Sequence, residues 1–572
     1  MKISFLLTFV LLLNANGSLA ADEAIISIFD SSSYFYPEHS KSGMVVSQEI
    51  IASRVGSKVL NDGGNAIDAA VATALVQTAV DPQMCGIAGF GSMHLYLPTL
   101  GEHLLLDFYG RAPAAVKSDM WQDLIEREAE DGFGFILKDR VNEMGYQSIT
   151  TPMTLRALDT ALKRFGTMDI ADLLQPAIHY AAEGFMVRPH VSYFWNVKEG
   201  AGRVPTIEKL KNYAATSAIY FKENGQLRAP GEILTNSDMA NTYRRIAKDG
   251  VDDFYSGTIA QEIIEDMRTN GGMLAAGDLN LARTSDNPPL WGEYRGLRVA
   301  TNPPPGGGVM VLEMLNILEN FDLKSMGHNS IKYISTLSEA MKIATVDKDN
   351  YLGDPNFVDV PTERLISKTH GADMALRIKS GEKTYVSRLG PQVEESKDTT
   401  QVTSIDEHGN CVSLTHSLGM PSGVVSAGLG FMYNGCMAVF DPRPGNPDSL
   451  APGKARFTAM CPTIVFKGDD PFFIVGAPGG TFITMGVLQV ILNAVEFGMD
   501  AQQAISAPRF CATSNTIDVS NRILRSVEAG LNLNGYPTRR TYLSYHFAGV
   551  HAVRLTGAGW DGGADPGRDG MA

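Results

Sequence analysis

Residues 398–418 read DTTQVTSIDEHGNCVSLTHSL, and this is the most informative stretch of the sequence. β-Branched residues dominate 399–406, a polar turn occupies 407–410, and 411–418 again has the composition of a strand. We therefore expect a β-hairpin. The residues before it, 382–398, contain few apolar side chains and several charges, which predicts an exposed strip. Asp398-Thr399 thus marks the junction of an exposed segment and a buried strand.

Helices and strands of both kinds are predicted around the hairpin, without a repeating period. Apolar residues recur at helical spacing from 47 to 80, where Gly63-Gly64 separates two helices and Asp81-Pro82 ends the second. No Gly/Ser-rich or Pro-rich linker divides the chain into independent halves. Further helices are expected over 152–165, 309–318 and 331–351, and short strands over 93–97, 104–108, 297–301 and 463–466.

The composition is that of a globular protein. The chain has 572 residues, of which 44% are hydrophobic and 19% charged, whereas a disordered chain carries far less apolar material. Its 48 basic and 63 acidic side chains give a formal charge of −15, which argues against nucleic acid or an anionic membrane as the main partner. An acidic soluble enzyme or binding protein is the simplest interpretation.

The first twenty residues have the three-part layout of a secretory signal peptide. Lys2 supplies a basic start, residues 3–13 form an apolar run, and Ser18 and Ala20 are small residues where a signal peptidase cuts. The apolar run is shorter than the roughly 20 residues that a membrane-spanning helix needs. We therefore expect residues 1–20 to be removed and the mature protein to be secreted or periplasmic, without a membrane anchor.

Several common catalytic and cofactor motifs are missing from the sequence. It has no Gly-x-Ser-x-Gly elbow, no P-loop and no His-Glu-x-x-His motif. Residues 86–91, GIAGFG, precede a predicted strand instead of opening a helix, which excludes a dinucleotide-binding loop. The histidines show no metal-ligand spacing, and the five cysteines form no Cys-x-x-Cys pair. We expect neither a metal nor another cofactor.

Short motifs spread along the chain carry a family resemblance. They are 63–70 GGNAIDAA, 81–87 DPQMCGI, 303–305 PPP, 351–355 YLGDP, the 399–410 hairpin, 462–465 PTIV, 476–481 GAPGGT and 507–510 APRF. Each is weak alone, but in this order the chain resembles the γ-glutamyltranspeptidase (glutathione hydrolase) family of N-terminal-nucleophile hydrolases. The resemblance implies an α+β fold, a four-layer αββα sandwich in which both parts of a cleaved chain share one core.

The resemblance makes Thr399 the nucleophile. A threonine hydroxyl is a weak nucleophile and needs an adjacent base. Cleavage of the Asp398–Thr399 bond would free an α-amino group, whose ordinary pKa of about 7.7–8.0 suits a general base near neutral pH. In the family, the hydroxyl itself attacks the preceding carbonyl. We therefore expect a large chain of residues 21–398 and a small chain of residues 399–572.

The resemblance also supplies the other catalytic groups. Gly479-Gly480 matches the family's oxyanion site, where one backbone N–H donor is worth two or more powers of ten in rate. Ser417 stands where the family has a threonine that orients the nucleophile, and it keeps a hydroxyl.

The positions that hold the γ-glutamyl group in the family are changed in this chain. An α-ammonium group bound without its acidic partner would be desolvated at a cost of a few kcal/mol. The pattern is therefore closer to the acylase and amidohydrolase branch, whose acyl groups often end in a carboxylate. Arg111 could bind such a carboxylate with its planar guanidinium, or it could be a surface charge. The residues at the changed positions are Tyr109, Gly419, Cys436, Val439, Thr458 and Ala459.

Three functions remain open at this point. The first is an exported, self-cleaving hydrolase or acyltransferase for γ-glutamyl or related acyl amides, with water or an amine as acceptor. The second is an acylase of the same family without γ-glutamyl specificity. The third, from another class, is an inactive exported solute-binding homologue. The retained Thr399, Ser417 and Gly479-Gly480 favour an enzyme, because a binding protein needs no activated threonine.

Overall fold

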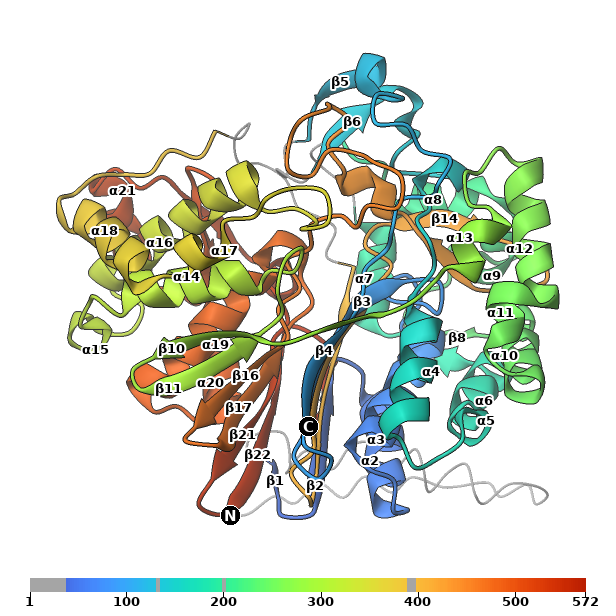
Figure 1. Ribbon diagram of the computed structural model, residues 1–572, viewed down its shortest axis with the longest axis horizontal. Helices are drawn as coiled ribbons and strands as arrows, with labels where there is room; N and C mark the ends of the chain where they lie inside the picture. Colours follow the sequence, from blue (N-terminus) through green and yellow to red (C-terminus); the bar gives the residue numbers. More distant parts are fainter. Residues whose placement is uncertain (1–37, 130–133, 198–201, 388–397) are drawn as a thin grey trace, which may run out of the picture.

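A computed structural model describes residues 38–129, 134–197, 202–387 and 398–572 of the chain (Figure 1). The predicted signal peptide, residues 1–20, lies outside the described residues, and so does most of the predicted strip, residues 388–397.

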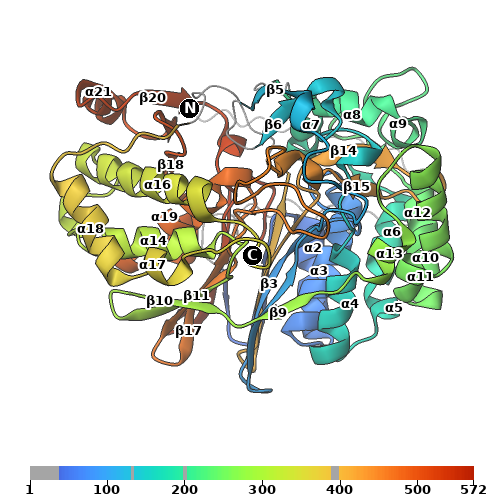
Figure 2. The same ribbon diagram turned by 45° about the horizontal axis from the view of Figure 1, so that its top comes forward.

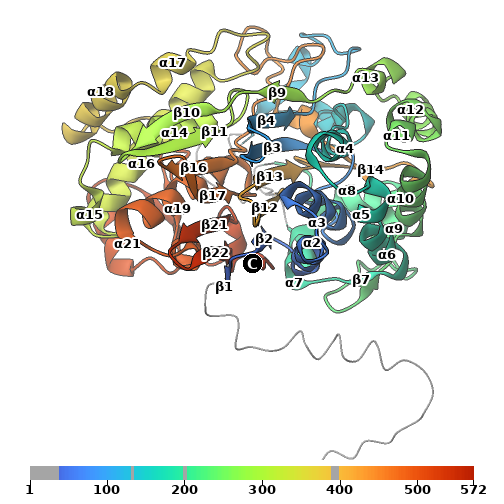
Figure 3. The same ribbon diagram turned by 60° about the horizontal axis from the view of Figure 1, so that its bottom comes forward.

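Two antiparallel sheets pack against each other in the middle of the molecule (Figure 3). Across this interface, β12 and β13 both contact β17. Strand β12 also contacts β21. One sheet has the order β2 (Gly43–Ser47), β12 (Thr400–Asp406), β13 (Cys411–Ser417), β3 (Phe90–Leu97), β4 (Glu102–Phe108), β9 (Ser285–Asn287). The other has the order β1 (Glu38–Ser40), β22 (Gly559–Ala564), β21 (His551–Thr556), β17 (Asp470–Gly476), β16 (Thr463–Lys467), β11 (Leu297–Thr301), β10 (Leu290–Tyr294).

Helices cover the outer face of each sheet (Figure 2). The side of the six-stranded sheet carries α2 (Ile50–Asn61), α3 (Ala66–Val80), α4 (Thr154–Phe165) and α6 (Gln175–Glu183). The side of the seven-stranded sheet carries α14 (Gly308–Leu318), α16 (Ile331–Tyr351), α18 (Lys368–Lys379) and α19 (Ile483–Phe497). The layers therefore run helix, sheet, sheet, helix, and the expected four-layer α+β sandwich is confirmed.

Smaller elements surround this sandwich. On the side of α3 lie α5 (Ile170–Leu173), α7 (Pro189–Asn196), α8 (Thr206–Asn212), α9 (Ala214–Tyr220), α10 (Ser237–Asp249), α11 (Asp252–Ser256), α12 (Thr258–Thr269) and α13 (Ala276–Asn280). The side of α14 adds α15 (Leu323–Met326), α17 (Thr362–Leu365), α20 (Ala501–Ser506) and α21 (Arg525–Leu533) (Figure 1). Short strands pair as β5 (Ile125–Glu128) with β6 (Phe135–Leu137), β7 (Phe185–Met186) with β8 (Ile233–Leu234), β14 (Pro421–Val425) with β15 (Met432–Asn434), and β18 (Phe510–Cys511) with β19 (Ile517–Ser520) and β20 (Thr538–Thr541).

Local sequence explains how the hairpin is fixed to the helical layer. The Asn65 side chain caps α3 by accepting from the backbone N–H groups of Ile67 and Asp68, and Asp68 accepts from the Asn65 N–H in return. Asp406, in the hairpin, accepts from the Ala66 N–H at 3.0 Å. The motif at 63–70 therefore starts a buried helix and joins it to the strand that begins at Thr400.

The two parts of the chain on either side of residue 398 are interleaved in both sheets. In the six-stranded sheet, β12 and β13 lie between β2 and β3, and in the seven-stranded sheet β16 lies beside β11. A cut at this position would therefore leave two chains that share one core. The predicted hairpin and the helix predicted over 331–351 are also confirmed, the helix with the same bounds.

Two further features concern the core. The stretch Gly480–Phe497 has the length and composition of a membrane span, but most of it is buried in the protein, as in the core helix of a soluble protein. All five cysteines are buried.

Candidate active site

Two hydroxyl groups converge on the Asp398–Thr399 peptide bond. The Thr399 hydroxyl donates to the carbonyl oxygen of Asp398, and the Ser417 hydroxyl donates to the same oxygen. The two hydroxyl oxygens are 3.1 Å apart. Thr399 is 4% exposed and Asp398 is 1% exposed, so the bond is held away from bulk water.

The pairing of β12 with β13 brings these groups together. Thr400 is registered opposite His416, which places Thr399 opposite Ser417 at the end of the hairpin. Beyond Ser417 the chain turns at Gly419, with φ +75°, and the Gly419 N–H donates to Ser417 Oγ at 2.7 Å. This bond fixes the rotamer of Ser417, because its oxygen must face both Gly419 and the Asp398 carbonyl.

The motif at 81–87 supports the other side of the bond. Gln83 sits in a left-handed conformation, φ 79°, between α3 and β3, and its side-chain amide donates to the Asp398 carboxylate. The contact holds Asp398 in place within the uncut chain.

Gly479 and Gly480 lie where helix α19 begins. Both have positive φ, 142° and 56°, and a Cβ on Gly479 would come within 2.6 Å of Ala548 Cα. Glycine is therefore required at position 479. The short helix Gly480–Phe482 leads directly into α19, so these backbone N–H groups belong to the positive end of a long helix. Such a helix start can stabilise an oxyanion.

A small cavity of about 30 Å³ lies beside the Asp398–Thr399 bond. It brings together the predicted nucleophile, Ser417, Gly480, Gly419 and the pair Thr458-Ala459. The described residues that line it are Phe90, Arg203, Asp398, Thr399, Ser417, Gly419, Met420, Arg456, Thr458, Ala459, Met460, Gly480 and Ile483.

Four of the predicted substrate-binding residues are not among these described lining residues. Tyr109 is buried, and its hydroxyl accepts from the Asn302 side-chain amide at 3.0 Å. Cys436 lies behind Gly419, where a Cβ on the glycine would be 2.9 Å from its sulfur. Val439 lines a separate hollow of about 430 Å³ together with Phe457.

Arg111 is the fourth, and its guanidinium is bound elsewhere. It lies 3.6 Å from the buried Asp354 carboxylate and donates to the Gly453 carbonyl and the Ser285 hydroxyl, both at 3.3 Å. These contacts join four segments of the chain. The geometry favours a structural role for Arg111 over the carboxylate binding that we considered for it.

Two arginines outside the predicted set of site residues line the cavity. Arg456 is 3% exposed, its guanidinium lies 4.6 Å from the centre of the Phe90 ring, and it donates to the Phe457 carbonyl at 3.1 Å. Arg203 is 5% exposed and lies 3.9 Å from the buried Glu143 carboxylate. The sequence does hold one indication that Arg456 belongs to the site, because it lies two residues before the predicted pair Thr458-Ala459. No local pattern distinguishes Arg203.

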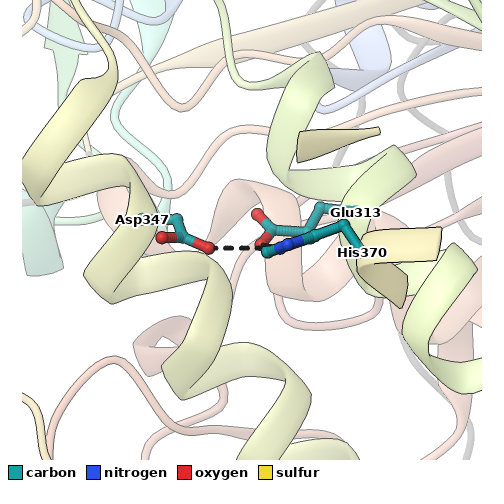
Figure 4. Close-up of side chains that lie close together, drawn as sticks. All are labelled: Glu313, Asp347 and His370. Carbon is teal, nitrogen blue, oxygen red and sulfur yellow. Dashed lines mark hydrogen bonds and ion pairs between the residues drawn. The ribbon is translucent and has the colours of Figure 1, made fainter. Parts of the chain in front are cut away.

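One cluster of side chains outside the cavity has the ligand types of a metal site (Figure 4). His370 Nε2, on α18, is 3.0 Å from Glu313 Oε1, on α14, and 3.4 Å from Asp347 Oδ2, on α16. Burial raises the pKa of Glu313 to about 8, and hydrogen bonds to Asp347 and Glu313 raise the pKa of His370 to about 9. At neutral pH a protonated Glu313 and a charged His370 thus balance Asp347, so we interpret the cluster as a link between three helices.

Fold and site together define the class of this protein. A threonine at the start of a central strand, with a second hydroxyl and a glycine pair beside it in an αββα sandwich, is the arrangement of an N-terminal-nucleophile amide hydrolase. The family model described as gamma-glutamyltranspeptidase matches residues 52–572, and the chain belongs to this enzyme family.

Relatives of two kinds are similar to the chain. It is 34% identical to the glutathione hydrolase proenzyme of Escherichia coli (strain K12), over 83% of this chain and 82% of that protein. It is 35% identical to the acylase ACY 1 proenzyme of Pseudomonas sp. (strain V22), over 88% of both chains. The crystal structure of cephalosporin acylase from Bacillus halodurans superposes with a TM-score of 0.83 and 28% identity, over 95% of this chain and 98% of that one. Sequence identity alone therefore does not separate the two activities.

Proposed function

We propose that the chain is an exported proenzyme that cuts its own Asp398–Thr399 bond and then cleaves acyl amides through an acyl-Thr399 intermediate. The observation that carries this proposal is the convergence of the Thr399 and Ser417 hydroxyls on the carbonyl of that one bond. The products of the cut would be the large chain, 21–398, and the small chain, 399–572. Export rests on the signal-peptide layout of residues 1–20.

Self-cleavage is an acyl shift followed by hydrolysis. Thr399 Oγ1 attacks the Asp398 carbonyl carbon, and the Ser417 hydroxyl stabilises the charge that develops on the carbonyl oxygen. The C–N bond then breaks, the nitrogen takes the proton that the Thr399 hydroxyl has lost and leaves as the free α-amine of Thr399, and an ester joins Asp398 to the Thr399 side chain. Water hydrolyses this ester, which releases the Asp398 carboxylate and restores the Thr399 hydroxyl.

In turnover, the new α-amine of Thr399 acts as the general base. It accepts the Thr399 hydroxyl proton while the oxygen attacks the substrate amide carbon, and it later protonates the leaving amine. The oxyanion would face the N–H groups of Gly479 and Gly480 at the start of α19. Water or an amine then takes the acyl group from Thr399.

We infer that the acyl group is not specifically γ-glutamyl. Among the described residues that line the cavity, Asp398 is the only acid, and its carboxylate accepts from the Gln83 side-chain amide. An α-ammonium group would therefore be buried without an acidic partner there. Glutathione hydrolysis is the second candidate, and the similarity to the Escherichia coli proenzyme supports it.

The test of self-cleavage compares two neighbouring threonines. Thr399→Ala should give a single uncut chain without amidase activity, whereas Thr399→Ser should still be cut. Thr400→Ala is the matched control, because Thr400 is also buried and its hydroxyl has no hydrogen-bond partner among the residues that the structure describes. Mass spectrometry of the purified proteins reads the result. If Thr399→Ala still yields two chains with a new terminus at residue 399, another protease makes the cut and the proposed mechanism is wrong.

A further inference from the structure

Two carboxylates and one imidazole point toward one another between three helices of the outer layer (Figure 4). Glu313 lies on α14, Asp347 on α16 and His370 on α18, and one ligand atom of each lies within 4.8 Å of the other two. The three helices contact one another in pairs. Side chains on packed helices are held more precisely than side chains on loops, so the helices present a fixed set of three ligand atoms.

The two carboxylates have no basic partner other than His370 within the described part of the chain. Neither Glu313 nor Asp347 forms an ion pair with a lysine or an arginine there. Glu313 is 1% exposed, and its second oxygen, Oε2, is buried and receives no hydrogen bond from any described donor. A buried carboxylate oxygen without a partner is costly. A cation between the three side chains would supply the missing partner.

The spacing of the ligand atoms fits a small transition-metal ion. His370 Nε2 lies 3.0 Å from Glu313 Oε1 and 3.4 Å from Asp347 Oδ2. Zinc binds imidazole nitrogen and carboxylate oxygen at about 2.0–2.2 Å, so the ligands of a tetrahedral zinc ion lie about 3.3–3.6 Å apart. An outward movement of a few tenths of an ångström would therefore admit a zinc ion between the three atoms.

The donor set favours zinc over the common alkaline-earth ions. Calcium and magnesium take oxygen ligands, whereas an imidazole nitrogen suits zinc and its transition-metal neighbours. Two ionised carboxylates with a neutral imidazole balance the charge of a divalent cation. Protons on Glu313 and His370 balance the cluster when no metal is bound, so the pH dependence of these groups belongs to the metal-free protein.

We propose that Glu313, Asp347 and His370 bind a zinc ion that ties α14, α16 and α18 together, with water as its fourth ligand. The side chains of Asp347 and His370 are 15% and 10% exposed, which leaves one side of the cluster open to solvent. Histidine spacing along the sequence does not reveal the site, because its ligands come from three separate helices. None of the three residues is among the described lining of the cavity beside Thr399, so the inference is independent of the proposed acyl-Thr399 chemistry.

The experiment measures zinc binding to the purified protein after treatment with EDTA and dialysis. Isothermal titration calorimetry with Zn²⁺ should show one saturable site per chain in the wild type, and Zn²⁺ should raise its melting temperature. His370→Gln and Glu313→Gln each remove one strong ligand, and each should weaken zinc binding at least about 100-fold. Ca²⁺ and Mg²⁺ at the same concentration should leave the melting temperature unchanged.

Glu339→Gln and His408→Gln are the matched controls. Glu339 is a buried carboxylate on the same helix as Asp347, but it pairs with Lys342 at 2.6 Å, and His408 is an exposed imidazole. Both variants should bind zinc as the wild type does.

Three results would overturn the inference. They are the absence of saturable zinc binding to the wild type, unchanged binding in His370→Gln or in Glu313→Gln, and an equal rise of the melting temperature with Ca²⁺. Circular dichroism of each metal-free variant checks its fold before titration, and the wild-type titration decides the question if a ligand variant does not fold.

Discussion

Ser417→Ala tests the central geometry of the site. In the uncut chain, Ser417 Oγ accepts from the Gly419 N–H at 2.7 Å, donates to the Asp398 carbonyl oxygen and lies 3.1 Å from Thr399 Oγ1. The side chain is fully buried, so water does not readily replace the lost hydroxyl. The substitution therefore removes a donor from the carbonyl under attack and leaves the Gly419 N–H without its acceptor.

The two losses have separate magnitudes. Removal of one donor to a developing oxyanion costs about 10²–10³ in rate, and we expect self-cleavage to slow by that factor. A buried N–H left without an acceptor costs about 1–3 kcal/mol, and we expect the free energy of unfolding to fall by that amount. Ser417→Thr keeps the hydroxyl and should retain most of the cleavage rate.

The assay follows the cut directly. The precursor is made by cell-free synthesis, and the fraction of uncut chain is measured against time on denaturing gels. Ser413→Ala is the matched control, because Ser413 is equally buried in β13, accepts from Gln401 at 3.0 Å and donates to the Val475 carbonyl at 3.2 Å. It should lose stability but be cut at the normal rate. A normal rate in Ser417→Ala, or an equal delay in Ser413→Ala, would refute the assigned role of Ser417.

Two further predictions concern backbone strain and pH. Gly479→Ala places a Cβ within 2.6 Å of Ala548 Cα, so it should displace the predicted oxyanion donors and lower amidase kcat at least about tenfold, measured on the cut enzyme. The folded-state pKa values of His370, about 9, and Glu313, about 8, both exceed their unfolded values of about 6.5 and 4.3, so their contribution to stability should be lost as pH rises toward 9. Between pH 6.5 and pH 9, the free energy of unfolding in urea should fall less for His370→Gln than for the wild type or for the exposed His408→Gln. A fall in His370→Gln as large as in the wild type would contradict the assignment.

The hairpin could be predicted from the sequence because its signals are local. β-Branched runs and a polar turn fix two strands, and the side-chain period of two fixes which residues face each other. The position of Thr399 opposite Ser417 follows from that register. The chain's helices could be predicted for the same reason, since a period of 3.6 over 331–351 lies within a single element.

The place of Arg456 in the cavity wall could not be predicted in this way. The segment at Arg111 forms a β-bridge with Ala455, the residue before Arg456. Successive residues of an extended segment point their side chains to opposite sides. Arg456, the residue after the bridge, can therefore face the cavity while Arg111 faces Asp354. The pairing joins positions more than 300 residues apart, and no local period in the sequence records it.

Arg456 and the pair Thr399–Ser417 lie in different segments of the chain, so the cavity wall can change while the two hydroxyls stay in place. The proposed nucleophile is held by β12 and β13, whose register places Thr399 opposite Ser417. Arg456 lies outside the named strands, in the segment between the short helix Cys436–Val439 and β16. Substitutions in that segment alter the charge of the cavity wall without moving the strands. The proposed change of acyl substrate would therefore combine altered contacts in this segment with two hydroxyls that stay on one carbonyl.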